Sequence, residues 1–140
     1  MKLTIQLLQF GGALHFAILC ASALVPRTLD WKTNLARLHP FLRQLFWVYG
    51  IFIVFVIISF GALTLWQAQT LASGAPLARG VCAFIALFWA LRLAVQIFVF
   101  DCREFLTRVW MKLGYHALTL AFLLLTGIYG WAALGKEAAL

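Results

Sequence analysis

The sequence predicts an all-α integral membrane protein, built as four transmembrane helices in an up-down bundle with short loops. Of the 140 residues, 65% are hydrophobic and only 11% are charged, and the mean hydropathy is +0.99. Soluble domains carry about 25% charged residues, so this chain has too few charges to cover a water-facing surface. Helices are expected because the apolar runs are long and lack the alternating polar positions of a membrane barrel.

Four apolar segments, each near the length that a membrane-spanning helix needs, make up a single transmembrane domain over residues 1–140. We expect the helices at about residues 3–25, 44–66, 81–100 and 113–134. Tryptophans near the ends of these segments agree with the aromatic belts that form at membrane surfaces.

The first segment shares features with secretory signal peptides. Lys2 precedes the apolar run, and Ala21-Ser22-Ala23 resembles a cleavage site. However, Gln6, Gln9 and His15 are unusual in the apolar core of a signal peptide. We therefore expect this segment to be retained as the first span.

The basic residues indicate the orientation of the chain. The first and third loops carry seven of them, namely Arg27, Lys32, Arg37, Arg43, Arg103, Arg108 and Lys112, and the opposite side carries Lys2, Arg79 and Lys136. By the positive-inside rule, loops 26–43 and 101–112 would be cytoplasmic and both termini outside, as in a bacterial inner membrane. The net charge of +7 is thus interpreted as a topology signal, and no nucleic-acid binding is expected.

The loops differ in pattern. Thr28–Pro40 and Asp101–Lys112 place apolar residues at helical spacing with charges between them. Both could form short helices in the membrane interface, or could be helix ends that run past the bilayer. The uncharged loop Gln67–Pro76 is expected to be flexible, and His39 before Pro40 is expected to begin the second helix.

Arg92 is the sharpest candidate for a functional residue. It lies about 12 Å into the bilayer in the third span, where an arginine costs about 2.5 kcal/mol or more. No Asp or Glu lies at a comparable depth, so snorkelling, neutral polar groups, water or an anionic ligand must satisfy the charge. Gln96 lies one turn away, and Trp89 is placed to stack on the guanidinium.

Both histidines within the spans are expected to point into the bundle. His15 shares a stripe of small and polar residues with Thr4, Gly11 and Ser22, and His116 begins a similar stripe. Such stripes usually face other helices, so an interhelical hydrogen bond is one interpretation. A haem ligand, a metal ligand or a proton carrier is the other. The histidines differ by roughly 9 Å in depth, which argues against both binding one haem.

These residues define a candidate polar pocket in the cytoplasmic half of the bundle. The candidate cofactor-binding residues are Arg92, Gln96, Tyr49, His15 and His116. Haem or a quinone is possible there, but the sequence identifies neither. No metal site is expected, because Cys20, Cys82 and Cys102 lack the spacing of a metal motif.

Two family resemblances rest on few residues. The four spans, Arg37-Leu38-His39 and Arg92 are similar to features of the membrane-associated eicosanoid and glutathione enzymes, whose Asn and Glu partners have no counterpart here. The mid-helix His15 and the later Pro26-Arg27 resemble the small haem-linked protoporphyrinogen oxidases. Neither resemblance assigns a family.

Three classes of function remain open from the sequence. A small chain with almost no part outside the membrane is interpreted first as a non-catalytic subunit of a larger membrane complex. Its partners would be the lipid bilayer and other membrane subunits, or further copies of itself. The first alternative is a small redox protein or enzyme that binds haem or a quinone. The second is a channel, transporter or lipid-handling protein. No motif of a catalytic site is present, so the interpretation leans away from an enzyme.

Overall fold

The computed structural model describes residues 1–101, 103–104 and 106–135, and the described residues form helices without any strand. The helices are α1 (Lys2–Ser22), α2 (Val25–Thr28), α3 (Trp31–Ala36), α4 (Pro40–Trp66), α5 (Ala68–Ala72), α6 (Pro76–Phe98) and α7 (Val109–Leu134). Four helical stretches are long and apolar enough to cross a membrane: α1 continued through α2, then α4, α6 and α7. The predicted all-α membrane fold with four spans is confirmed.

Three spans begin four or five residues before their predicted starts. α4 and α6 each have a proline in the first turn, where the missing N–H costs nothing. The ring Nδ1 of His39 accepts a hydrogen bond from the backbone N–H of Phe41 at 3.2 Å, so His39 caps α4 as expected. Apolarity alone misses these first turns because they contain polar residues. α1 ends earlier than predicted, at Ser22, and the chain continues into α2.

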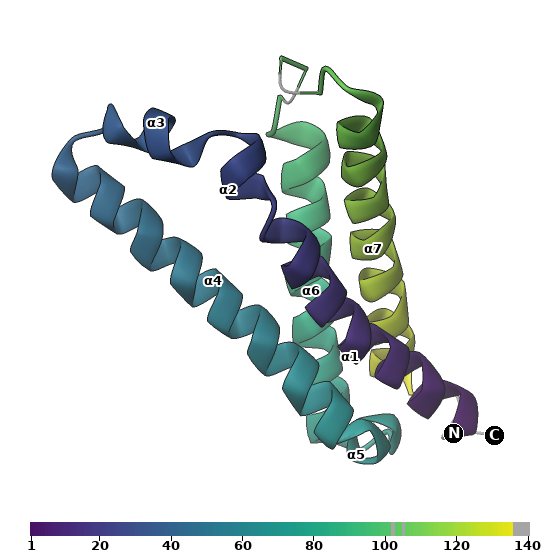
Figure 1. The fold of residues 1–140 in the computed structure, drawn as a ribbon. Coiled ribbons are helices and arrows are strands. Elements are labelled where there is room, and N and C mark those ends of the chain that lie inside the picture. The colour runs from purple at the N-terminus through teal and green to yellow at the C-terminus, as the bar shows by residue number, and fades with distance from the viewer. Residues whose placement is uncertain (102, 105, 136–140) are drawn as a thin grey trace.

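Figure 1 shows how the four spans are arranged. α6 and α7 run antiparallel and lie side by side, and α1 crosses them in contact with α7. α4 meets α1 near the end that carries α5 and then diverges from the other spans toward the end that carries α2 and α3. The start of α1 and the end of α7 lie at the same end of the molecule.

Glycines allow α1 and α4 to approach closely. A Cβ atom on Gly61 of α4 would lie 3.1 Å from the Cβ of His15 and 3.2 Å from the carbonyl oxygen of Gly12. Both neighbours belong to α1, and such distances are too short for a comfortable contact. Small residues at membrane helix crossings serve this purpose, because packing has to replace the hydrophobic effect inside lipid.

The short helices decide between the loop predictions. Residues 31–36 form α3, whose Leu35 is buried, so of the two alternatives for the first loop the structure has the short helix. In the third loop the described residues form no separate helix, and Val109 to Lys112 belong to α7. The stretch expected to be a flexible loop instead forms α5, because Leu71 turns inward and packs in the core.

A side-chain hydrogen bond joins the start of α6 to the end of α7. The Nε–H of Arg79 donates to the carbonyl oxygen of Ala133 at 2.8 Å, which satisfies one of the last free carbonyls of α7. Gly135 ends the helix with a φ of 61°, a conformation that glycine adopts without strain. Arg79 therefore has a structural role besides its contribution to the charge pattern.

Candidate functional site

His15 lies at the centre of the bundle with both ring nitrogens hydrogen bonded. Its Nδ1 lies 2.7 Å from the carbonyl oxygen of Gly11, and its Nε2 accepts from the indole N–H of Trp89 at 2.9 Å. An indole nitrogen can only donate, so Nε2 holds a lone pair and the proton sits on Nδ1. His15 is therefore a neutral imidazole whose donor and acceptor are both used within the chain.

Aromatic rings from the other three spans surround this imidazole. The ring centroids of Trp89 on α6, Tyr129 on α7 and Phe60 on α4 lie 5.3, 5.7 and 6.2 Å from that of His15, each edge to face. The side chains of His15, Trp89 and Tyr129 are 0% exposed. The imidazole is thus the point at which all four spans meet.

A second hydrogen-bonded pair lies beside the imidazole. Thr64 of α4 donates its hydroxyl proton to the carbonyl oxygen of Phe60 at 2.7 Å. The hydroxyl oxygens of Thr64 and Tyr129 lie 2.7 Å apart. Because threonine has only one hydroxyl proton, Tyr129 must donate to Thr64. We call His15, Trp89, Tyr129 and Thr64 the central polar cluster.

Sequence reasoning identified His15 but missed the other three members of the central polar cluster. Of the predicted stripe, Thr4, Gly11 and His15 are buried, whereas Ser22 is only partly buried. Trp89 could have been found from its spacing, because it falls on the same seven-residue repeat as Cys82 and Gln96, which are also buried. Spacing alone does not show that the indole reaches α1.

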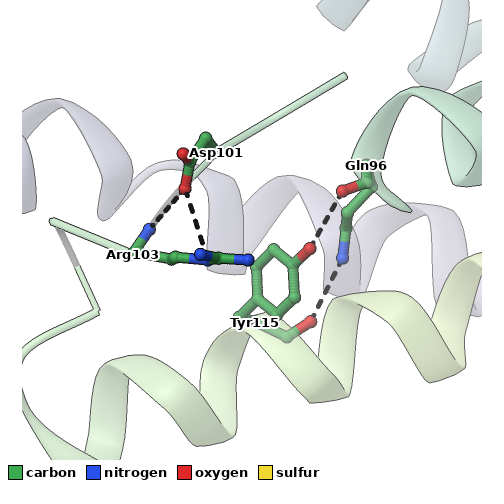
Figure 2. A network of polar contacts seen from close by, with 4 residues as sticks. All are labelled: Gln96, Asp101, Arg103 and Tyr115. Atoms are coloured by element: carbon green, nitrogen blue, oxygen red, sulfur yellow. Dashed lines mark hydrogen bonds and ion pairs between the residues drawn. The ribbon is translucent and has the colours of Figure 1, made fainter. Parts of the chain in front are cut away.

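Gln96 hydrogen bonds across to α7, and we call its bonds with Tyr115 and Thr119 the clamp. Its side-chain N–H groups donate to the hydroxyl of Thr119 and to the carbonyl oxygen of Tyr115 at 3.2 Å, the latter bond being shown in Figure 2. In return, the hydroxyl of Tyr115 donates to the backbone carbonyl of Gln96 at 2.9 Å. The amide is therefore occupied in holding two neighbouring spans together.

The Asp101–Arg103 pair in the same figure has a different character. The carboxylate lies 3.9 Å from the guanidinium Nε and accepts from the backbone N–H of Arg103 at 3.3 Å. Both side chains are largely exposed. Such a pair adds little to stability, because water competes for both charges.

Arg92 has no hydrogen-bond partner for its buried Nε atom among the residues that the structure describes. Its guanidinium carbon lies 5.9 Å from the ring centroid of Phe122 on α7, which places the charge over an aromatic face. The predicted stacking on Trp89 is not found among the described residues, where the guanidinium lies over the ring of Phe122. Arg92 also makes no hydrogen bond with Gln96, whose amide is directed to α7.

The remaining two candidates lie on the outside of the isolated chain. Tyr49 on α4 is 62% exposed. His116 is exposed as well, so the prediction that it points into the bundle is wrong. The inward face of α7 is set by Phe122, Leu125 and Tyr129, and His116 lies about 240° around the helix from Phe122.

The five sequence candidates are therefore distributed over separate places. No hydrogen bond or ring contact joins any two of them in the described chain. His15 belongs to the central polar cluster and Gln96 to the clamp, whereas Arg92, Tyr49 and His116 stand apart. Within the described ranges, no three His, Cys, Asp or Glu side chains gather closely enough to hold a metal ion. The binding of haem or a quinone stays a prediction from the sequence.

The comparisons with known proteins identify no family, so the class of this protein is defined by its fold alone. No protein-family model, curated protein or solved structure matches this chain. It is a four-span helical membrane protein in which the side chains of His15, Thr64 and Gln96 form hydrogen bonds across the spans.

Proposed function

We propose that this chain is a non-catalytic subunit of a larger membrane complex and that it contacts other membrane-spanning helices through α4. One observation carries the proposal. Residues 40–56, the first half of α4, include no buried side chain, and the structure describes all of them. The second half buries Ile57, Gly61 and Thr64 against its neighbours. Half of a span thus lacks the packing against the other spans that positions its second half.

The outward face of this half-span is strongly aromatic. Phe41, Val48, Phe52 and Phe55 follow one another at spacings of seven, four and three residues, and all four are exposed in the isolated chain. Large rings on a membrane helix offer wide surfaces for van der Waals packing with another helix. An adjacent subunit would use this stripe.

The hydrogen bonds of the buried polar side chains also favour a subunit over a redox protein. Both nitrogens of His15 and the amide of Gln96 are bonded within the chain, so neither is free to bind a cofactor in this conformation. A haem would have to take its axial ligand from elsewhere, for example from the exposed His116. An absorption spectrum of the purified, haem-supplied protein distinguishes the two functions, since a Soret band would favour the redox alternative.

Photo-crosslinking in the membranes of the native host tests the subunit proposal. p-Benzoylphenylalanine replaces Phe52 on α4 or, as the matched control, Phe84 on α6, because both phenylalanines are 62% exposed. We expect an adduct with another membrane protein from position 52 and only lipid adducts from position 84. The proposal fails if position 52 gives only lipid, or only a crosslink to a second copy of this chain.

We also propose that the end carrying α2 and α3 faces the cytoplasm of a bacterial inner membrane. The support is the excess of basic residues in the first and third loops. Single cysteines at Thr33 and Ser73, in a chain freed of its native cysteines, test the orientation. A reagent that cannot cross the membrane should label position 73, and not position 33, on intact cells.

A further inference from the structure

A cavity of about 440 Å³ lies where α2 and α3 meet the first turns of α4. It is separate from the central polar cluster and shares no residue with the five sequence candidates. Its volume falls within the range of small-molecule sites, about 300–1,000 Å³. Its walls include Arg27, Trp31, Lys32, Leu35, Arg43 and Trp47.

Three cations from three helices line this cavity. Arg27 belongs to α2, Lys32 to α3 and Arg43 to α4. None of the three has an ion pair or a side-chain hydrogen bond in the part of the chain that the structure describes. Asp30 is the acidic residue nearest to them in sequence, and it is exposed and makes no ion pair with them. Three like charges around one cavity favour an anion there.

Tryptophans place the cavity at the membrane surface. The ring of Trp31 lies 5.7 Å from that of Trp47 and 4.9 Å from that of Phe46, each edge to face, which packs α3 against α4. Tryptophan concentrates at the level of the lipid headgroups, and both rings lie near the ends of candidate spans. The anion in this cavity would therefore sit at headgroup depth.

The stripe of α4 that begins at the cavity is open at Gly50, and Val54 on the same stripe is 45% exposed. Arg43, Trp47, Gly50 and Val54 follow one another on the stripe of α4 that continues, deeper in the membrane, to Ile57. At Ile57 the stripe is buried, but above it α4 has diverged from the other spans (Figure 1). A Cβ atom on Gly50 would meet nothing within 4 Å. The stripe therefore offers uncovered apolar surface below Arg43, which is the kind of surface that an acyl chain contacts.

We propose that this cavity binds the phosphate group of an anionic phospholipid, with an acyl chain along the inner stripe of α4. The guanidinium groups of Arg27 and Arg43 and the ammonium group of Lys32 donate to phosphate oxygens, for which these side chains are suited. A free phosphate would use the same cations, but only a lipid uses the open stripe at Gly50. The lipid fills the inner side of the half-span whose outer side we assign to a partner.

Native mass spectrometry of the full chain released from detergent tests the proposal. Dioleoyl phosphatidylglycerol is compared with dioleoyl phosphatidylcholine, which carries the same phosphate and acyl chains but no net charge. We expect the anionic lipid to be retained preferentially. The triple variant R27Q/K32Q/R43Q should weaken its binding by about tenfold or more.

A matched control distinguishes lipid binding at the cavity from a general effect of positive charge. The variant R103Q/R108Q/K112Q removes three basic residues from the third loop, at the same end of the molecule, and leaves the cavity lining intact. It should keep the binding of phosphatidylglycerol within about twofold of the unchanged chain. Equal losses in the two triple variants would overturn the proposal, as would equal retention of both lipids by the unchanged chain.

A variant that keeps every charge tests the acyl path. Gly50→Leu fills the open stripe without disfavouring the helical conformation, since leucine is a good helix former. It should reduce lipid retention while the melting temperature stays near that of the unchanged chain. A large excess of inorganic phosphate should displace little lipid. Full retention by Gly50→Leu, or complete displacement by phosphate, would show a site for free phosphate and overturn the assignment to a lipid.

Discussion

The indole N–H of Trp89 on α6 donates to Nε2 of His15 on α1 over 2.9 Å, inside a fully buried cluster. The backbones of α1 and α6 make few close approaches, so this side-chain bond is a main connection between the two spans. The large indole fills the space between them. It also determines which nitrogen of His15 carries the proton.

Trp89→Phe should destabilise the chain measurably. The phenyl ring keeps most of the apolar volume but loses the donor, which leaves Nε2 of His15 buried without a partner. An unsatisfied buried acceptor costs about 1–3 kcal/mol. Reversible unfolding in mixed detergent micelles measures this loss. The control Trp66→Phe, at a position that is 82% exposed, should change the free energy of unfolding by at most about 0.5 kcal/mol.

Gly61→Ala should weaken the crossing of α1 and α4. The added methyl group would lie 3.1 Å from the Cβ of His15 and 3.2 Å from a backbone oxygen, so the helices must move apart. Overpacking of this kind costs about 1–3 kcal/mol. Gly127→Ala on α7 is the control, because nothing lies within 4 Å of its Cβ position. A Gly61→Ala chain as stable as the Gly127→Ala chain would contradict the close approach.

Gln96→Leu should loosen α6 from α7 while leaving the rest of the bundle in place. It removes the donors to Tyr115 and Thr119. Interhelical hydrogen bonds in membranes contribute about 0.6 kcal/mol on average and up to about 1.7 kcal/mol. Unfolding free energies measure the change. Asp101→Asn, which breaks only the exposed pair of Figure 2, should have no measurable effect.

Arg92→Met should leave the isolated chain as stable as before, or stabilise it. The substitution removes a buried Nε atom that has no partner in the described chain and keeps an unbranched apolar side chain over Phe122. Removing an unsatisfied buried polar atom stabilises the folded chain by the cost of desolvating that atom, which is about 1–3 kcal/mol. Thermal unfolding of the purified protein measures the effect. A clear drop in melting temperature would show that Arg92 contributes a stabilising contact within the chain itself.

The candidate site could be predicted only in part, and particular residues show why. The seven-residue and four-residue spacings around His15 place it correctly in the core, because a membrane helix turns its small and polar residues toward other helices. The same argument fails for His116. Its stripe is real, but α7 presents the neighbouring stripe of Phe122 and Tyr129 to the bundle. Local spacing predicts a face without showing which face the other spans cover.

By itself the sequence determined the membrane class, the four spans, the helix cap at His39 and the inward position of His15. These properties depend on local apolarity and on helical periodicity, which are present in the order of the residues. Only the tertiary structure decided that Trp89 reaches His15, that Gln96 binds α7, and that three basic residues surround one cavity at the start of α4. The physical reason is that these contacts join residues on different helices, and their distances depend on how the helices cross.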